Sequence, residues 1–291
     1  MTHIVDAQVH VWPPQSEQNQ WTGETHNYLG KAGDISSAAR ESFSGEDLLA
    51  ELAGAGVDRA VLVPPVFGGD DNGYALAAAA RYPDRFAVMG RFQLDRPDPE
   101  RVRNWLSQPR MVGIRLTFFY DRHVEWLSDE TVDWIWPILA ETGIPTAVFA
   151  PGNTPKIEQI ARRYPDMRLV IDHFGIPQRA RDAEIVPFVE QLLPVADLEN
   201  VRIKASALTS HSTGPFPFTV LHEPIRRVVA AFGAERVFWG SELTRQPQPY
   251  DECVRLFSEG LTFLSDAERA LIMGDAISAW LDWAPTPTPA A

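Results

Sequence analysis

The chain has 291 residues, 45% of them hydrophobic, and a formal net charge of −13. This charge argues against nucleic acid or an anionic membrane as the main partner, whereas a small anionic substrate can still bind in a local arginine pocket. With Cys253 as the single cysteine, a disulfide framework within the chain is excluded, and we expect a cytoplasmic protein. We expect neither a signal peptide nor a membrane span, because no apolar run approaches the roughly 18 residues that a span needs.

The first periodic segment of the chain, residues 4–12, alternates between apolar and polar residues with the two-residue period of a β-strand. Gln8 and His10 therefore point to the same side, close to the break at Pro13-Pro14. Because a strand rarely buries an amide and an imidazole together without polar partners, we interpret this pair as the first part of an active site.

The rest of the chain alternates between short apolar segments and amphipathic ones. Residues 13–43 lack periodicity and are predicted to form a long loop that can act as a lid, and residues 284–291 a disordered tail. Further strands are predicted at 59–63, 86–91, 111–116, 145–149, 167–172, 201–205 and 236–240. Helices are predicted at 44–55, 72–81, 98–107, 129–142, 154–163, 184–195, 221–232, 249–259 and 265–282.

This alternation is typical of a parallel sheet that helices cover. About eight strands are enough to close a barrel, so we predict an α/β fold, a single (β/α)₈ TIM barrel over residues 1–283. An open, doubly wound sheet is the alternative. The first strand is not followed by a glycine-rich dinucleotide fingerprint, which disfavours that alternative.

Polar residues follow most of the predicted strands, at the barrel end where catalysis occurs. They are Gln8, His10, Arg91, Arg115, Asp172, His173, Lys204, Ser206, Ser241 and Glu242. Each also has a structural interpretation: His173 as a core histidine, Glu242 as a helix cap or a partner of Arg245, and Arg91 as a rim salt-bridge residue. Lys204 stands between apolar neighbours and needs a carboxylate or a substrate as partner.

Five segments resemble the amidohydrolase-related (amidohydrolase 2) family, and most of all its branch of 2-pyrone-4,6-dicarboxylate hydrolases and lactonases. They are Asp6-Ala7-Gln8-Val9-His10-Val11-Trp12, Gly113-Ile114-Arg115-Leu116, Ile171-Asp172-His173-Phe174-Gly175, Ile203-Lys204-Ala205-Ser206 and Trp239-Gly240-Ser241-Glu242-Leu243-Thr244. Two positions depart from the family pattern: Gln8 replaces the first histidine of Asp-x-His-x-His, and Glu242 replaces an aspartate.

The resemblance implies that His10, His173 and Glu242 occupy metal-ligand or acid/base positions. Zinc or manganese remains possible with these three ligands, although a neutral Gln8 amide is a poorer ligand than imidazole. Because the pyrone-dicarboxylate branch is understood to act without metal, we favour a site with no cofactor.

The predicted function is hydrolysis of a lactone or similar cyclic ester of a carboxylated, flat small molecule. Glu242 would activate water, while His10, His173 and Lys204 polarise the carbonyl. Arg115, and with less support Arg91, would bind a substrate carboxylate, with Gln8 also at the substrate. An aromatic wall is predicted from Trp12, Phe67, Phe118, Phe119, Tyr120, Phe174, Phe216 and Phe218.

Three alternatives to lactone hydrolysis stay open. They are a metal-dependent decarboxylase of an aromatic or dienoic acid, hydrolysis of another amide or ester, and a barrel that binds a ligand without catalysis. The partner expected in each case is a small molecule, and a homo-oligomer is compatible with the sequence.

Overall fold

The computed structural model of the protein describes residues 3–14, 42–119 and 121–283. The two ends of the predicted loop at 13–43 lie close together. Trp12, just before the loop, and Phe43, at its end, form an isolated antiparallel bridge. The remainder of that loop and the predicted tail at 284–291 lie outside the described residues.

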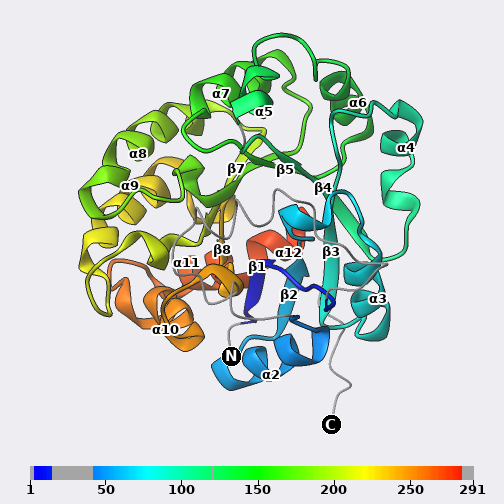
Figure 1. Cartoon of the computed structure of the whole chain (residues 1–291). Coiled ribbons are helices and arrows are strands. Elements are labelled where there is room, and N and C mark those ends of the chain that lie inside the picture. Colours follow the sequence, from blue (N-terminus) through cyan, green and yellow to red (C-terminus); the bar gives the residue numbers. More distant parts are fainter. Residues whose placement is uncertain (1–2, 15–41, 120, 284–291) are drawn as a thin grey trace.

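Eight parallel strands form one sheet in chain order, with helices around it (Figure 1). The strands are β1 (Val5–Val9), β2 (Arg59–Leu62), β3 (Phe86–Arg91), β4 (Met111–Thr117), β5 (Thr146–Phe149), β6 (Leu169–Ile171), β7 (Val201–Ser206) and β8 (Val237–Gly240). The sheet closes between β8 and β1, where the Glu242 amide donates a hydrogen bond to the Gln8 carbonyl at 2.8 Å. The predicted (β/α)₈ barrel is confirmed.

The helices cover the outer face of the barrel. They are α2 (Gly45–Ala55), α3 (Gly73–Arg81), α4 (Pro99–Arg103), α5 (Asp121–Glu125), α6 (Ile135–Thr142), α7 (Thr154–Arg163), α8 (Val186–Leu192), α9 (His222–Phe232), α10 (Tyr250–Arg255), α11 (Asp266–Ala270) and α12 (Ala276–Trp280). None of the described helices is long and apolar enough to cross a membrane.

Several helices are shorter than their periodicity predicts. The helix predicted at 129–142 begins only at Ile135, and α5 was not predicted. The helix predicted at 98–107 ends at Arg103 and gives way to a 3₁₀ turn, Trp105–Ser107. There the Trp105 indole N–H donates to the Gly113 carbonyl at 2.9 Å, which ties the turn to β4. Tertiary contacts of this kind override helix propensity.

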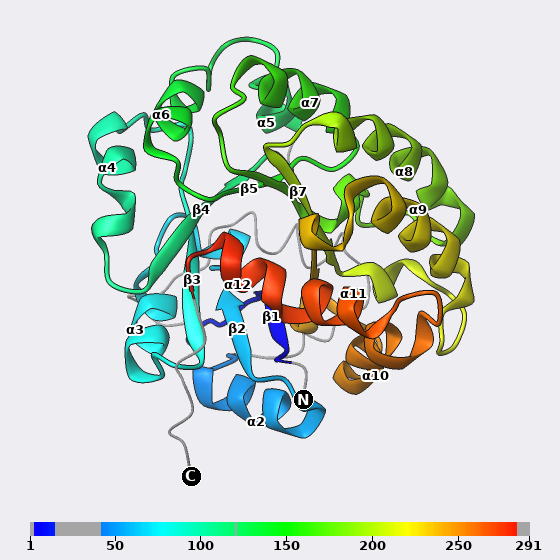
Figure 2. The same ribbon diagram turned by 180° about the vertical axis from the view of Figure 1, so that it is seen from behind.

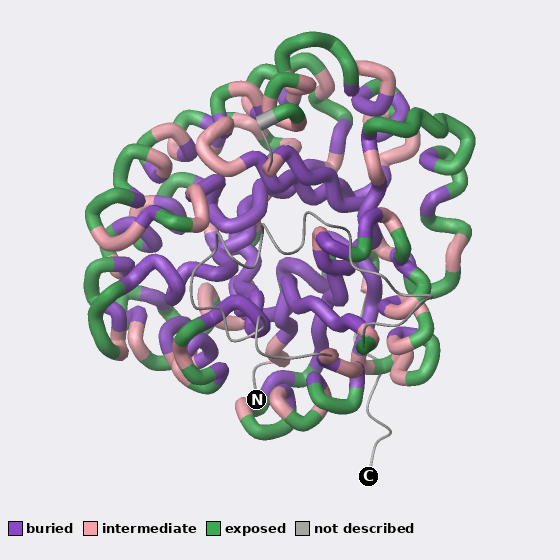
Figure 3. The backbone as a smooth tube through the Cα atoms, viewed as in Figure 1, coloured by how far each residue is buried: buried purple, intermediate pink, exposed green. Residues whose placement is uncertain are grey.

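Most strand positions are apolar because both faces of the sheet are buried (Figure 3). One apolar cluster fills the space between sheet and helices. A second combines barrel residues such as Val61 and Phe238 with Ile277 and Trp280 of α12. Figure 2 shows α12 lying across this end of the barrel, and the rings of Phe238 and Trp280 are 5.4 Å apart. Helix α12 thus closes the end of the barrel opposite the end at which the polar strand-end residues lie.

The side chains of strand β1 do not alternate strictly between the two faces of the sheet. Its pairing with β2 shifts register between Asp6 and Val9, as at a β-bulge. The Asp6 carboxylate accepts a hydrogen bond from the Tyr250 hydroxyl of α10 at 3.1 Å, whereas the Gln8 side chain bonds Lys204 of β7. The bulge therefore separates Asp6 from Gln8, which strict alternation would place on the same side.

Gly274, in the π-helical turn Leu271–Asp275 before α12, packs directly on the chain that enters β1. A Cβ at this position would overlap the His3 carbonyl. We expect Gly274→Ala to lower the free energy of unfolding by about 1–3 kcal/mol, as overpacking does. Gly54→Ala is the matched control, because that exposed helical position has open space for a methyl group, and a gain of about 0.5–1 kcal/mol is expected. Urea unfolding curves measure both; equal midpoints for Gly274→Ala and wild type would contradict this packing.

Candidate active site

The polar residues predicted at the strand ends come together around the Glu242 carboxylate. His10 follows β1, His173 lies in the 3₁₀ turn Asp172–Gly175 after β6, and Glu242 follows β8. His10 Nε2 is 3.2 Å from Glu242 Oε1, and His173 Nε2 is 3.2 Å from Glu242 Oε2. All three side chains are buried.

Two sharp backbone turns direct these side chains into the barrel mouth. His173 and Glu242 both have a left-handed backbone, with φ of 54° and 53°. This conformation costs a non-glycine residue roughly 1–2 kcal/mol. Hydrogen bonds oppose that cost at Glu242: its own amide donates to Gln8, and the preceding Ser241 amide donates to the Asp6 carboxylate at 2.9 Å.

The partners of His10 determine where its hydrogens lie. Nδ1 is 2.6 Å from the Val63 carbonyl oxygen, which can only accept, so Nδ1 donates to it. Nε2 faces a carboxylate oxygen, which also accepts when ionised. His10 therefore links the Val63 carbonyl after β2 to the Glu242 carboxylate after β8.

His173 is held by partners on both ring nitrogens. Its Nδ1 is 2.8 Å from the Ser206 hydroxyl, which can donate to it, and its Nε2 lies 3.2 Å from Glu242 Oε2. Burial lowers the pKa of His173 to about 4, even though the Glu242 and Asp172 carboxylates oppose that shift. His173 is therefore neutral at pH 7.

Burial alone would raise the pKa of Glu242. The Arg245 guanidinium, whose Nη1 donates to Oε2 at 2.9 Å, and the two histidines outweigh burial and lower this pKa well below its usual value. Glu242 is therefore ionised at neutral pH.

A second network of charges lies beside this group. Arg115 Nε donates to Asp172 Oδ2 at 2.7 Å, and Lys204 Nζ is 3.1 Å from Asp172 Oδ1. Lys204 also donates to Gln8 Oε1 at 2.8 Å. Burial would raise the pKa of Asp172, but Lys204 and Arg115 lower it to about 2. This ion network links β1, β4, β6 and β7 beneath the site.

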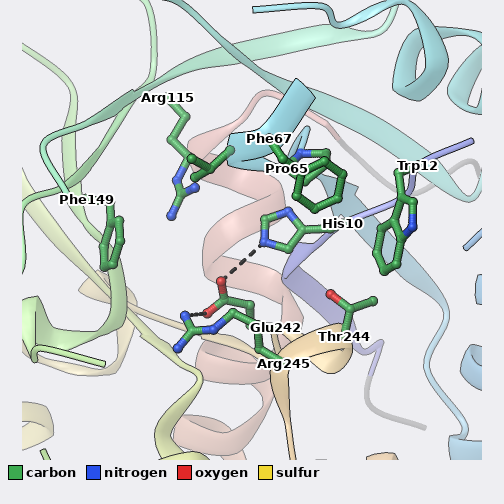
Figure 4. A pocket seen from close by; sticks show the side chains of 10 residues that line it. His10, Trp12, Pro65, Phe67, Arg115, Phe149, Glu242, Thr244 and Arg245 are labelled. Atoms are coloured by element: carbon green, nitrogen blue, oxygen red, sulfur yellow. Dashed lines mark hydrogen bonds and ion pairs between the residues drawn. The ribbon is translucent and has the colours of Figure 1, made fainter. Parts of the chain in front are cut away.

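A pocket opens directly above the Glu242 carboxylate (Figure 4). Its cavity volume is only about 20 Å³, and it is lined by His10, Trp12, Pro65, Val66, Phe67, Arg115, Phe149, Glu242, Thr244 and Arg245. Figure 4 shows His10, Arg115, Glu242 and Arg245 facing the same space, with Phe149 on one side and Trp12 and Phe67 on the other. The pocket therefore combines acid, base and cationic groups with aromatic walls.

The other predicted site residues lie elsewhere. Gln8 and Lys204 are wholly buried and bonded to each other, outside the pocket lining. Arg91 lines a neighbouring pocket. Phe118 and Phe174 belong to the apolar core rather than the predicted aromatic wall. Tyr120 lies outside the described residues.

Sequence reasoning did not assign five of the lining residues to the site: Pro65, Val66, Phe149, Thr244 and Arg245. Arg245 was considered only as a structural partner of Glu242, and the structure shows that Glu242 contacts Arg245 and both histidines together. Phe149 and Thr244 were not assigned to the site. The position of Phe149 at the end of β5 could have identified it.

The donor set does not suit a divalent metal. Among the described residues, no group of three His, Cys, Asp or Glu side chains could hold a metal ion. Each oxygen of Glu242 already lies 3.2 Å from an imidazole nitrogen, and Arg245 donates to one of these oxygens. Arg115 Nη2 lies 3.4 Å from His173 Nε2. A divalent cation here would face two guanidinium groups at short range.

The fold and the site together define a class, a (β/α)₈-barrel hydrolase with its polar groups at the carboxyl ends of the strands. A family model described as Amidohydrolase matches residues 5–282. The chain belongs to the amidohydrolase family, and the predicted family and hydrolase class are confirmed.

Among named relatives, L-fucono-1,5-lactonase from Burkholderia ambifaria is 31% identical over 245 residues, which are 83% of this chain and 80% of the relative. Two solved structures share the fold. One is a probable 2-pyrone-4,6-dicarboxylic acid hydrolase from Acinetobacter baumannii, with 19% identity, a TM-score of 0.74 and coverage of 97% of this chain and all of the other. The second is an amidohydrolase from Burkholderia multivorans with bound zinc, with 20% identity, a TM-score of 0.75 and coverage of 96% and 99%.

Removal of the Arg245 charge tests the electrostatics of the site. In wild type the pKa of Glu242 is depressed, so its ionised form is lost only as the pH falls well below the usual range. In Arg245→Met this pKa rises, and the acid limb of the kcat/KM profile should move up by about one pH unit or more. Arg255→Met, which removes an exposed ion pair with Glu259, should leave that limb in place. An unchanged limb in Arg245→Met would show that Arg245 does not control Glu242.

Proposed function

We propose that this protein is a lactonase that opens a cyclic ester with water, without a metal ion. The observation that carries this proposal is the Glu242 carboxylate between two imidazoles, at the base of a pocket with aromatic walls. The 31% identity with a named lactonase supports the same reaction class.

In this mechanism Glu242 is the base that takes a proton from the attacking water. The Nε2–H group of His10 turns toward the lactone carbonyl, and its hydrogen bond stabilises the developing oxyanion. Once His10 bonds the substrate, Glu242 loses one of its donors. Its basicity therefore rises at the moment when water must be deprotonated.

Ring opening completes the reaction. The water oxygen forms a bond to the carbonyl carbon, the bond from that carbon to the ring oxygen breaks, and the proton held by Glu242 passes to the departing alkoxide. His173 helps to position the Glu242 carboxylate, because its Nε2 lies 3.2 Å from one carboxylate oxygen while Ser206 fixes its ring. The product is a hydroxy acid.

Arg115 and Lys204 support the site in different ways. The Arg115 guanidinium lines the pocket and can also stabilise negative charge on the substrate. Lys204 is enclosed by Asp172, Gln8 and Met89, so its positive charge reaches the substrate only through the ion network. The alternative of a decarboxylase requires a metal, for which the described residues offer no ligand set.

Two substitutions test the assigned roles. Glu242→Gln removes the base, and His173→Ala removes the group that orients it. Each should lower kcat for lactone hydrolysis at least about a hundredfold, as loss of general acid–base catalysis does. Glu259→Gln, at an exposed position, is the control and should keep the wild-type rate. Near-normal rates in both site variants would remove Glu242 and His173 from the mechanism.

Metal analysis tests the second part of the proposal. Protein purified without chelator should contain far less than one equivalent of zinc or manganese by elemental analysis. Dialysis against EDTA should leave kcat/KM unchanged, because guanidinium and imidazole groups supply the positive charge at the carboxylate. One bound equivalent of either metal, with activity lost on its removal and restored on its return, would refute metal-free catalysis.

A further inference from the structure

Asp6 of β1 is a wholly buried carboxylate that lies outside the reacting group of Glu242 and the two histidines. Burial raises its pKa to about 6, although its hydrogen bonds oppose that shift, so Asp6 is ionised above this pH. A charge kept away from water is costly unless hydrogen bonds or opposite charges stabilise it. The stability of ionised Asp6 therefore depends on the donors that surround it.

Four donors converge on the Asp6 carboxylate. Its Oδ1 accepts from the Gln8 amide at 3.0 Å and from the Ser241 amide at 2.9 Å. Its Oδ2 accepts from the Ser241 hydroxyl and from the Tyr250 hydroxyl, the latter at 3.1 Å. Each oxygen thus accepts two hydrogen bonds, which a carboxylate can do at both oxygens and the amide of asparagine at only one.

Ser241 connects Asp6 to the next residue, Glu242. Both the amide and the hydroxyl of Ser241 donate to Asp6. The hydroxyl oxygen also accepts from the Leu243 amide at 2.8 Å, and the Ser241 carbonyl accepts from Gln246 Nε2 at 2.9 Å. Every polar group of Ser241 is therefore engaged, and the backbone is fixed on both sides of Glu242.

The turn at Glu242 needs this support because its backbone is in the left-handed region. Its φ is 53°, a conformation that is unfavourable for a residue with a Cβ. The direction of the side chain follows from this conformation, and so do its 3.2 Å contacts with His10 and His173. Misplacement of a reacting group by about 1 Å can lower a rate about a hundredfold. Relaxation of the turn would therefore impair catalysis by moving the carboxylate away from the imidazoles.

On the basis of the lactonase function proposed above, we infer that Asp6 is a positioning residue for the Glu242 carboxylate. Asp6 acts through Ser241: its two oxygens hold the backbone in the left-handed turn, and the turn directs Glu242 between the imidazoles. The Tyr250 hydroxyl of α10 holds the Asp6 carboxylate from the other side. Asp6 itself does not line the pocket, so it affects the reaction only through Glu242.

Kinetics of three variants test this role, with a six-membered lactone as substrate at a pH well above the pKa of Asp6. Asp6→Asn removes one acceptor oxygen, and Ser241→Ala removes the hydroxyl. Each should lower kcat at least about tenfold and change KM less than about threefold, because the base is misplaced while the pocket lining stays. Tyr250→Phe, which removes one donor, should lower kcat several-fold. Tyr82→Phe is the matched control, because this hydroxyl donates to the exposed Glu46, and it should keep the wild-type kcat.

Two further measurements distinguish positioning through Ser241 from a loss of stability. A variant with both Asp6→Asn and Ser241→Ala should be no more than about threefold slower than the slower single variant, whereas independent effects multiply. The imidazole nitrogen NMR signals of His10 and His173 should shift in Asp6→Asn and stay in place in Tyr82→Phe. This second measurement needs no substrate.

The possible results distinguish failure of this inference from failure of the proposed function. If wild type hydrolyses no lactone, the lactonase function is refuted, and the NMR signals alone decide whether Asp6 positions Glu242. Wild-type kcat in folded Asp6→Asn and Ser241→Ala, multiplied losses in the double variant, or unchanged imidazole signals would overturn the positioning role. Circular dichroism and thermal unfolding show whether each variant is folded; if Asp6→Asn is not, Ser241→Ala and Tyr250→Phe decide by the same kinetic and NMR criteria.

Discussion

The contact between Glu242 and the two histidines joins the end of the barrel to its beginning. Glu242 follows β8 and His10 follows β1, so their 3.2 Å contact exists only because the sheet closes. The same junction carries the Glu242–Gln8 backbone hydrogen bond and the Ser241–Asp6 contact. Barrel closure and assembly of the site are therefore one structural event, and disruption of either should affect the other.

Charge balance explains why this buried site is stable. A single buried carboxylate is costly, but both carboxylates here have close cationic or hydrogen-bonding partners. Asp172 lies between Arg115 and Lys204, and Glu242 contacts Arg245 as well as the histidines.

The two arginines on the neighbouring strands β3 and β4 have different surroundings at the barrel mouth. Arg115 is tied to Asp172 in the buried charge network, whereas Arg91 is held through its backbone by Asn72 and lines the adjoining pocket. Neighbouring strands of one barrel can thus present the same residue type in two separate settings, as expected of a fold whose members differ in chemistry.

The sequence by itself determined the barrel and most of the strand-end residues, because apolar strands with polar ends follow from local periodicity. It also placed Gln8 and His10 on one side of β1. Only the tertiary structure decided which of these residues face the pocket. The bulge in β1 separates Asp6 from Gln8, and the left-handed turns at His173 and Glu242 direct both side chains inward. Lys204 is enclosed and Phe118 belongs to the core, since residues distant in sequence surround them. Bulges, turns and such distant neighbours depend on how the strands pack, and no local pattern encodes them.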